Sequence, residues 1–262
     1  MVKKFLKIWV LMSKNALQEQ ITSLLAVVFF TLGKVVRFIF FFVFLFTVVS
    51  STKSLAGYDA NQVILFFLIF NVVDITAQFF FRGVYVFRFL VASGDFDLHL
   101  VKPLPSFFYP LFRRTDILDF VVLVPLWILT LWFIFSRGLT PNLVYFIYFL
   151  IFYLNALIVA FAIHISVCSI GVITLAVDHL IEIYRDLLNL ARFPTDIYQR
   201  SIQAILTFAV PIIIMITLPT KALMGLLSWQ WVVLSFVISG IALWASLRFW
   251  KYALTQYSSA SS

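Results

Sequence analysis

The sequence is poor in charged residues. Only 11% of its 262 residues are Asp, Glu, Lys or Arg, whereas 63% are hydrophobic. A soluble globular protein carries about 25% charged residues and needs them to cover its core with a polar surface. This deficit excludes a water-soluble globule and indicates that lipid surrounds most of the chain.

Residue types that build reactive centres are also scarce. Cys168 is the only cysteine and there are three histidines, which excludes an intrachain disulfide and a cysteine-rich zinc cluster. No Gly-x-x-x-x-Gly-Lys-Ser/Thr run is present to cradle the phosphates of ATP. We therefore expect this chain to have no catalytic residues, no metal and no cofactor of its own, and not to be an enzyme.

Basic residues outnumber acidic residues by 19 to 11, which gives a formal charge of +8. A nucleic-acid-binding protein gathers its basic residues on one face or stripe. Here they occupy short segments between apolar runs, as they do in the cytoplasmic loops of membrane proteins. The charge therefore indicates orientation in a membrane, and no nucleic-acid partner is expected.

The amino-terminal segment has apolar residues at helical spacing and lysines on another side. The pattern predicts a helix in the headgroup plane, with its apolar face in lipid. Residues 24–30 are also apolar, so Gly33 and Lys34 mark either a kink or the true start of the first span. We assign residues 1–31 to this interfacial elbow helix and to the point where the chain enters the membrane. The apolar residues that define the helix are Phe5, Ile8, Trp9, Met12 and Ala16.

Several later stretches are long and apolar enough to span a membrane, which takes about 20 residues. Segment 163–190 begins as apolar and becomes amphipathic, so whether this fifth span crosses fully stays open. Segment 202–225 contains Pro211 and Pro219, which are tolerated at membrane depth only where freed backbone groups face protein or water. The sequence thus predicts an all-α polytopic membrane protein with six transmembrane helices and a re-entrant segment before the last one. The other five spans are residues 32–49, 63–81, 118–135, 143–162 and 231–247.

The positive-inside rule places both termini of this six-span arrangement in the cytoplasm. Most basic residues then lie in cytoplasmic segments, including Arg248 and Lys251 near the carboxyl end. Three arginines on the external side count against the arrangement: Arg185, Arg192 and Arg200.

The cytoplasmic loop between the second and third spans, residues 82–116, contains the most informative local pattern. Gly94 suits a left-handed helix end, and Asp95 can cap the helix that follows. Pro103 and Pro105 then stop that helix. The pattern predicts a short amphipathic helix within the loop.

Three blocks resemble, in order and spacing, the most recognisable parts of a bacterial ABC-2-type permease family. They are GDFDLHLVKPL at 94–104, RFPTDIY at 192–198 and VPIIIMITLPTKALMG at 210–225. The resemblance implies a transmembrane domain over residues 32–262 in the plasma (inner) membrane, which works as a dimer with a second copy or a sister permease. It further implies an ATP-driven exporter in which a separate ATP-binding subunit holds the ATP and Mg. The transported cargo stays open.

The same resemblance implies roles for particular residues. Loop 82–116 would supply the coupling helix that docks on the ATP-binding subunit, and segment 202–225, with Pro211 and Pro219, would form the re-entrant gate on the external side. The docking residues that it implies are Asp95, Phe96, Asp97, Leu98 and Lys102, with Arg82 and Arg88 nearby.

Asn71, Asp74 and Gln78 form one polar stripe on the second span. One aspartate at a helix centre costs about 2.5–3.5 kcal/mol on insertion, which the many apolar residues of the span offset at about 0.3–0.6 kcal/mol each. The stripe either faces the translocation path or dimer seam, or pairs with Lys34 or Arg37. An ion-coupled secondary carrier that uses Asp74 is the alternative function, although such a carrier predicts a repeated, inverted pattern of broken helices.

Overall fold

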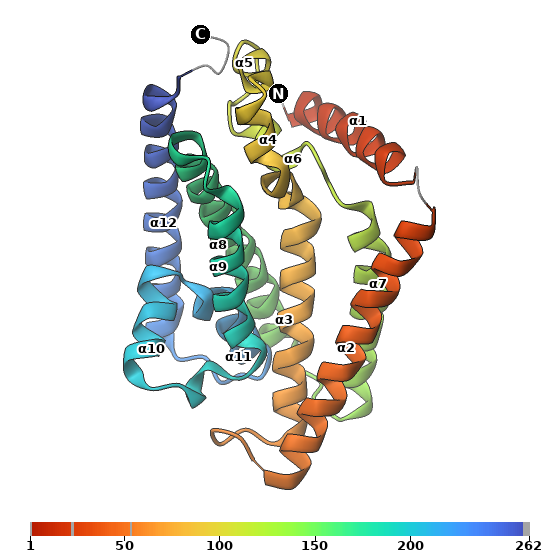
Figure 1. The fold of residues 1–262 in the computed structure, drawn as a ribbon. Coiled ribbons are helices and arrows are strands. Elements are labelled where there is room, and N and C mark those ends of the chain that lie inside the picture. The colour runs from red at the N-terminus through yellow and green to blue at the C-terminus, as the bar shows by residue number, and fades with distance from the viewer. Residues whose placement is uncertain (1, 22–23, 53, 259–262) are drawn as a thin grey trace.

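The computed structural model describes residues 2–21, 24–52 and 54–258, and this part of the chain is built from helices (Figure 1). In chain order the elements are α1 (Val2–Ile21), α2 (Leu24–Thr52), α3 (Ala60–Phe81), η1 (Arg82–Val86), α4 (Phe87–Ala92), α5 (Asp95–Leu100), α6 (Phe108–Phe112), α7 (Ile117–Ser136), α8 (Leu143–Thr174), α9 (Val177–Asn189), η2 (Leu190–Arg192), η3 (Thr195–Ile197), α10 (Arg200–Ala204), η4 (Ile205–Ala209), η5 (Ile213–Thr217), α11 (Leu218–Leu223) and α12 (Trp229–Gln256).

Five stretches in the described residues are long and apolar enough to cross a membrane. A bent pair, Arg200–Ala209 with Ile213–Leu223, makes a sixth if it is counted as one span. The predicted fold class, an all-α polytopic membrane protein, is therefore confirmed. The five stretches are Val27–Thr52, Ala60–Ala92, Ile117–Ser136, Leu143–Thr174 and Trp229–Gln256.

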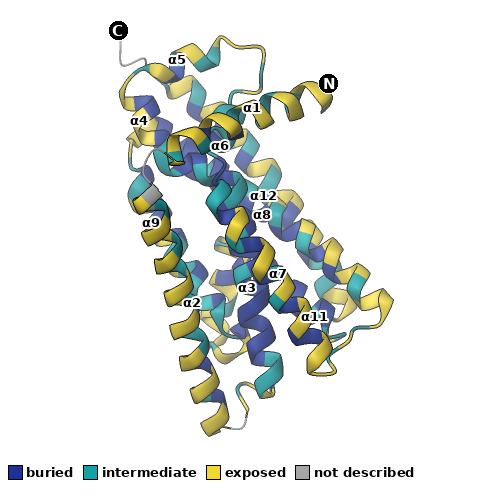
Figure 2. Ribbon diagram, turned by 90° about the vertical axis from the view of Figure 1, so that its right-hand side faces the viewer, coloured by how far each residue is buried: buried dark blue, intermediate teal, exposed yellow. Residues whose placement is uncertain are grey.

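The first span is one continuous helix. Gly33 and Lys34 lie inside α2, so the span begins before them and the assigned boundary at residue 31 falls within the helix. Only 11% of this span is buried, and its exposed side faces outward along its whole length (Figure 2). Exposed aromatic side chains such as Phe40 suit contact with lipid.

Helix α3 is the centre of the bundle. Of this span 78% is buried, and it packs against α2, α7 and α8, while α12 lies along α8. The capping box at the start of α3 pairs the Asp59 carboxylate with the Gln62 backbone amide, and the Gln62 side chain accepts a hydrogen bond from the Asp59 amide. The polar stripe of the second span is therefore held in the interior and not on the lipid face.

Helix α1 lies beside the end of the bundle that also holds α5 and the carboxyl end of α12 (Figure 1). Its expected apolar face packs on protein and not on lipid: the Trp9 indole donates to Thr115 Oγ1 at 2.9 Å and contacts the ring of Phe80. The exposed apolar side chains of α1 are Leu6, Val10 and Leu11. Helix α1 therefore packs on the bundle through the apolar face that the sequence analysis had assigned to lipid.

The fourth apolar stretch is longer than expected, because residues 163–174 continue α8. Leu175, with φ of 61°, ends the helix in the left-handed conformation, and the amphipathic α9 then runs back along α8. Asp178 at the start of α9 pairs with Arg88 beyond one end of α3, whereas Asp196, shortly after α9, binds Tyr58 beyond the other end. The chain therefore runs along the bundle for a fifth time here, with an amphipathic helix that is not one of the five long apolar stretches.

The segment after this helix enters and leaves at one end of the bundle. Its two arms meet at an angle of 87°, at the break over residues 210–212 that contains Pro211. It begins soon after Asp196, and Gly225 at its other end lies against the ring of Tyr145 near the start of α8. The geometry is that of a re-entrant hairpin.

Candidate functional site

The short helix α5 is held in place by one aromatic anchor. Gly94 adopts φ of 77°, which turns the chain out of α4 and into α5. Phe96 is fully buried against Phe87, Trp250 and Tyr257. Because burying a Phe side chain stabilises by about 1.5–3 kcal/mol, this residue fixes α5 to α4 and α12. Its ring offers no surface to a partner, so Phe96 acts as the anchor of the helix and not as a contact residue.

The opposite side of α5 is exposed and partly apolar. Leu98 is 63% exposed and Val101, directly after the helix, is 83% exposed. Asp95 and Lys102 flank this pair and are also exposed. Asp95 does not cap the helix as expected; it is the first helical residue, and its carboxylate accepts a hydrogen bond from Ser93 Oγ at 2.8 Å.

His99 stiffens this surface. Its ring stacks on Tyr109, and Lys102 Nζ lies 3.1 Å from its Nδ1. Burial, together with the charges of Lys102 and Arg113, lowers the pKa of His99 from 6.5 to about 4. The ring is therefore neutral at physiological pH and can accept the Lys102 ammonium proton in a hydrogen bond.

Two polar contacts, one from α4 and one from α5, join other parts of the fold. Arg88 of α4 pairs with Asp178 of α9 at 2.8 Å, although both side chains are about half exposed. The Asp97 charge acts on the Tyr257 hydroxyl beyond α12, and burial and this charge raise the pKa of Tyr257 to about 12. The loop is therefore linked to α9 through α4 and to Tyr257 through α5.

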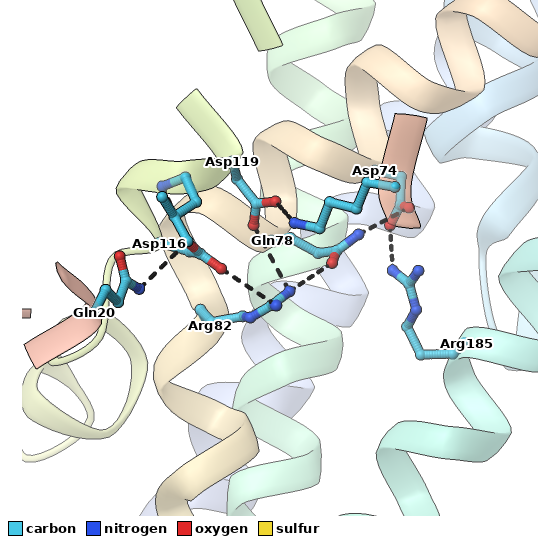
Figure 3. A network of polar contacts seen from close by, with 9 residues as sticks. Gln20, Asp74, Gln78, Arg82, Asp116, Asp119 and Arg185 are labelled. Carbon is cyan, nitrogen blue, oxygen red and sulfur yellow. Dashed lines mark hydrogen bonds and ion pairs between the residues drawn. The ribbon is translucent and has the colours of Figure 1, made fainter. Parts of the chain in front are cut away.

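A polar network lies in the interior where α2, α3, α7 and α9 meet (Figure 3). Gln78 donates to one oxygen of Asp74 at 2.9 Å, and Arg185 of α9 donates to the other at 2.5 Å. Arg82 donates to Gln78 Oε1 at 2.7 Å. Both oxygens of Asp74 are thus engaged, and its ionic partner is Arg185 rather than Lys34 or Arg37, the pairings considered from sequence.

The same network continues to α7 and α1. Arg82 pairs with Asp116 at 3.2 Å and lies 3.7 Å from Asp119, and Lys34 of α2 also pairs with Asp119. Gln20 of α1 donates to Asp116 at 3.3 Å. Arg82 is therefore occupied in this buried network, and it is not part of the exposed face around α5 where the resemblance had placed it.

A cavity of about 220 Å³ adjoins the network between α2, α3 and α7. The polar stripe Asn71, Asp74 and Gln78 lines it, as do Arg37 and Arg192. Asn71 also donates to the Phe67 carbonyl at 2.7 Å, so its amide is partly used within α3. The stripe predicted from sequence therefore shares one hollow with two arginines that sequence reasoning did not connect to it.

The re-entrant hairpin has irregular backbone at its turn. The π-helical turns η4 and η5 flank Pro211, which is buried, and Pro219 is buried in the first turn of α11. Turns of this kind often mark functional sites. Lys221 pairs with Asp196 at 2.8 Å, and Asp196 also accepts from the Tyr58 hydroxyl at 2.9 Å, so the base of the hairpin is tied to the α2–α3 loop.

The described residues contain no group of three His, Cys, Asp or Glu side chains that could hold a metal ion. Cys168 and His164 are both buried in α8, and His164 Nδ1 contacts the Ala160 carbonyl at 2.7 Å. The interior carboxylates described above are each engaged in an ion pair.

Comparison with known families decides the class of protein. A model of the ABC-2 family of transporter proteins matches residues 34–261. The chain belongs to the ABC-2 transporter family. No curated protein and no solved structure matched it.

Membership explains the arrangement described above. An ABC-2 protein is the membrane permease of an ABC transporter, so this chain is a multi-pass transport subunit rather than an enzyme. The family match covers α5, the cavity, the re-entrant hairpin and all of the polar network except Gln20, and leaves out α1. The resemblance noted from the three sequence blocks is thereby confirmed.

Proposed function

We propose that this ABC-2 protein forms, as a dimer with a second copy or a sister permease, the translocation pathway of an ATP-driven exporter. A separate ATP-binding subunit docks on α5, binds the ATP and Mg, and drives the transport cycle. The observation that carries the proposal is the exposed apolar pair Leu98 and Val101 on a helix anchored from behind by Phe96.

Exposed apolar residues on an anchored surface helix are the chemistry of a docking site, because their burial by a partner releases water. Asp95, Lys102 and Asp97 surround the pair and supply charges at its rim. Arg88 holds the neighbouring helix α4 to α9 and transmits motion rather than docking directly.

The route from α5 to the interior is short. A shift of α4 acts on Asp178 of α9 through Arg88, and α9 carries Arg185, whose partner Asp74 lines the cavity. The pair at Asp74 connects α9 to the central helix α3. Movement of the docking helix can thus alter the cavity through two ion pairs on one helix.

The orientation that fits this proposal places α1, α5 and the carboxyl end of α12 in the cytoplasm, at the plasma (inner) membrane. These three elements lie at one end of the bundle (Figure 1). The re-entrant hairpin, with Pro211 and Pro219, then opens to the external side, where we propose that it forms the gate. Two of the arginines that weighed against this orientation are not loop charges: Arg185 pairs with Asp74, and Arg192 stacks on aromatic rings.

An ion-coupled secondary carrier that uses Asp74 is less well supported. Its coupling carboxylate would have to bind and release an ion in each cycle. Asp74 is 6% exposed and has one oxygen on Arg185 and the other on Gln78. Those contacts occupy both of its oxygens, which favours a structural role within the transporter.

The proposal is tested by co-expressing the chain with its ATP-binding subunit and replacing Leu98 or Val101 by Lys. A Lys at either position places a charge where an apolar contact is expected, so co-purification and coupled ATP turnover should fall sharply. Thr140→Lys, in an exposed loop at the opposite end of the bundle, is the matched control. Unchanged complex formation in both α5 variants would show that the docking surface lies elsewhere.

A further inference from the structure

Positive charge exceeds negative charge among the residues of the polar network and of the cavity beside it. Each of the three carboxylates already has a basic partner: Asp74 pairs with Arg185, Asp116 with Arg82 and Asp119 with Lys34. Two more arginines, Arg37 and Arg192, line the same cavity and form no ion pair with a carboxylate in the part of the chain that the structure describes. The cavity therefore has a surplus of two positive charges.

The two arginines act on one space. The Arg192 guanidinium lies 4.8 Å from the centre of the Phe41 ring and 5.5 Å from that of Phe70, and its Nε is buried without a hydrogen-bond partner. Arg37, one turn before Phe41 on α2, is close enough for its charge to act on Arg192. Two like charges held together in this way favour an anion between them.

The hydrocarbon of the bilayer offers no counter-charge to Arg37 and Arg192. A cationic side chain within a span is costly to insert, and a contact with an aromatic ring returns only part of that cost. A guanidinium presents its donors as a fork that matches carboxylate and phosphate groups. An anion with oxygen atoms is thus the ligand chemistry that these two side chains select.

Apart from the polar stripe and the Lys34–Asp119 pair, the rest of the cavity wall is apolar. Phe67 stacks on Phe38 at 5.2 Å and on Phe41 at 5.0 Å, and these rings line the cavity together with Phe70. A small inorganic anion would leave these rings facing empty space, whereas a hydrocarbon chain covers them. The ligand therefore needs an apolar body beside its charged group.

We propose that this cavity binds an amphiphilic anion, with its phosphate or carboxylate head between Arg37 and Arg192 and its hydrocarbon body on the phenylalanine rings. The ligand is either an acidic lipid from the bilayer or a single-chain amphiphile that enters from solution. That the ligand is also the cargo rests on the proposed function, whereas the binding site does not.

Binding is measured on the full-length chain in a neutral maltoside detergent, with radiolabelled dodecyl phosphate as the probe. One molecule should bind per chain. Arg37→Gln and Arg192→Gln should each weaken binding by about tenfold or more, because each removes a charged hydrogen bond. Arg137→Gln, in the exposed turn after α7, is the matched control and should leave binding unchanged.

Competitors distinguish the source of the ligand. Displacement of the probe by phosphatidylglycerol indicates a lipid from the bilayer, and binding that phosphatidylglycerol does not displace indicates a single-chain amphiphile. Either result supports the site. Competition by dodecyltrimethylammonium, or equal competition by inorganic phosphate, would overturn it, since the first lacks the anion and the second lacks the hydrocarbon.

Two further results keep the test decisive. Arg37 is exposed, so Arg37→Gln is expected to fold even if Arg192→Gln does not, and Arg192→Lys then serves for the second position. If Arg37→Gln disrupts the dimer and leaves probe binding intact, a second copy neutralises Arg37 and the proposal is wrong. Leu98→Lys should abolish docking of the ATP-binding subunit but keep probe binding, so failure of the proposed function and failure of this site give different results.

Discussion

The ion pair between Asp74 and Arg185 allows a quantitative test of how the amphipathic helix α9 is held. Arg185 Nη1 lies 2.5 Å from Asp74 Oδ1, and the two side chains are 19% and 8% exposed. Asp74→Asn keeps the size of the side chain but leaves Arg185 charged without its partner. Arg185→Gln leaves Asp74 with Gln78 as its only hydrogen-bonding neighbour.

Removing one member of a buried pair costs about 3–5 kcal/mol, because the remaining charge stays buried and uncompensated. At about 2–4 °C per kcal/mol, each single variant should lower the apparent Tm by about 6–20 °C. The double variant buries no unpaired charge and should lose less than the sum of the two single losses. The difference measures the coupling between α3 and α9.

The assay is a thermal melt of the detergent-solubilised protein, followed by size-exclusion chromatography after heating. Asp178→Asn is the matched control, because its pair with Arg88 has side chains that are 42% and 51% exposed. An exposed pair contributes only about 0–1 kcal/mol. If both interior variants melt within the range of this control and their effects simply add, the pair does not hold α9 and the reasoning fails.

Three further predictions follow from local geometry. Gly83→Ala should destabilise the protein by about 1–3 kcal/mol in the same melt, because the added Cβ would lie 2.3 Å from the Pro110 carbonyl oxygen. Gly33→Ala is the control and should be neutral or stabilising, because its Cβ would meet nothing within 4 Å. Equal effects of the two substitutions would contradict the packing argument. Because the pKa of His99 is lowered from 6.5 to about 4, the unfolded chain takes up a proton first as the pH falls; the melting temperature should therefore drop between pH 6.5 and pH 4, and His99→Phe should remove that part of the drop. Single cysteines placed at Thr52, Ser93 and Ser258 in a Cys168→Ala background test the orientation. In intact cells the cysteine at position 52 should be labelled from outside, and those at 93 and 258 only after permeabilisation. Any other pattern refutes the proposed orientation.

Most of the fold could be predicted from sequence, because lipid allows only one way to satisfy the backbone of a spanning segment. Long apolar runs therefore located α2, α3, α7, α8 and α12. The predicted bounds of α3 and α7 agree to within three residues, whereas α2 begins eight residues earlier, and α8 and α12 end twelve and nine residues later, than predicted. The fifth predicted span was harder. Its apolar beginning, residues 163–174, belongs to α8, and its remainder is the amphipathic α9, whose charges conceal it from a measure based on length and apolarity.

The local chemistry of α5 was partly readable. The left-handed Gly94 was correctly predicted, since glycine takes positive φ without strain, whereas Asp95 was misplaced by one position in the cap. Which side of α5 is exposed required the structure, because Phe96 and Leu98 are both apolar and only packing against α12 separates them.

The partners in the interior network could not be read from sequence either. Asp74 and Arg185 are 111 residues apart, and Lys34 and Arg37 were equally plausible partners for Asp74 by helical position. The sequence offered one signal, an excess of positive over negative charge in and next to the spans. This excess can be assigned to particular arginines only after the structure shows which cation pairs with each carboxylate. That Arg192 lines the cavity could likewise be seen only in the structure.

The amphipathic character of α9 has a consequence for how the protein is made. Helix α9 carries Asp178, Glu182, Arg185 and Asp186 within 13 residues, and charged residues of this kind oppose insertion by about 2.5–3.5 kcal/mol each at a helix centre. An isolated α9 would therefore stay outside the bilayer. Placing α9 within the bilayer requires Asp74 of α3 to receive Arg185, so the position of this helix depends on a tertiary contact with a helix made earlier in the chain.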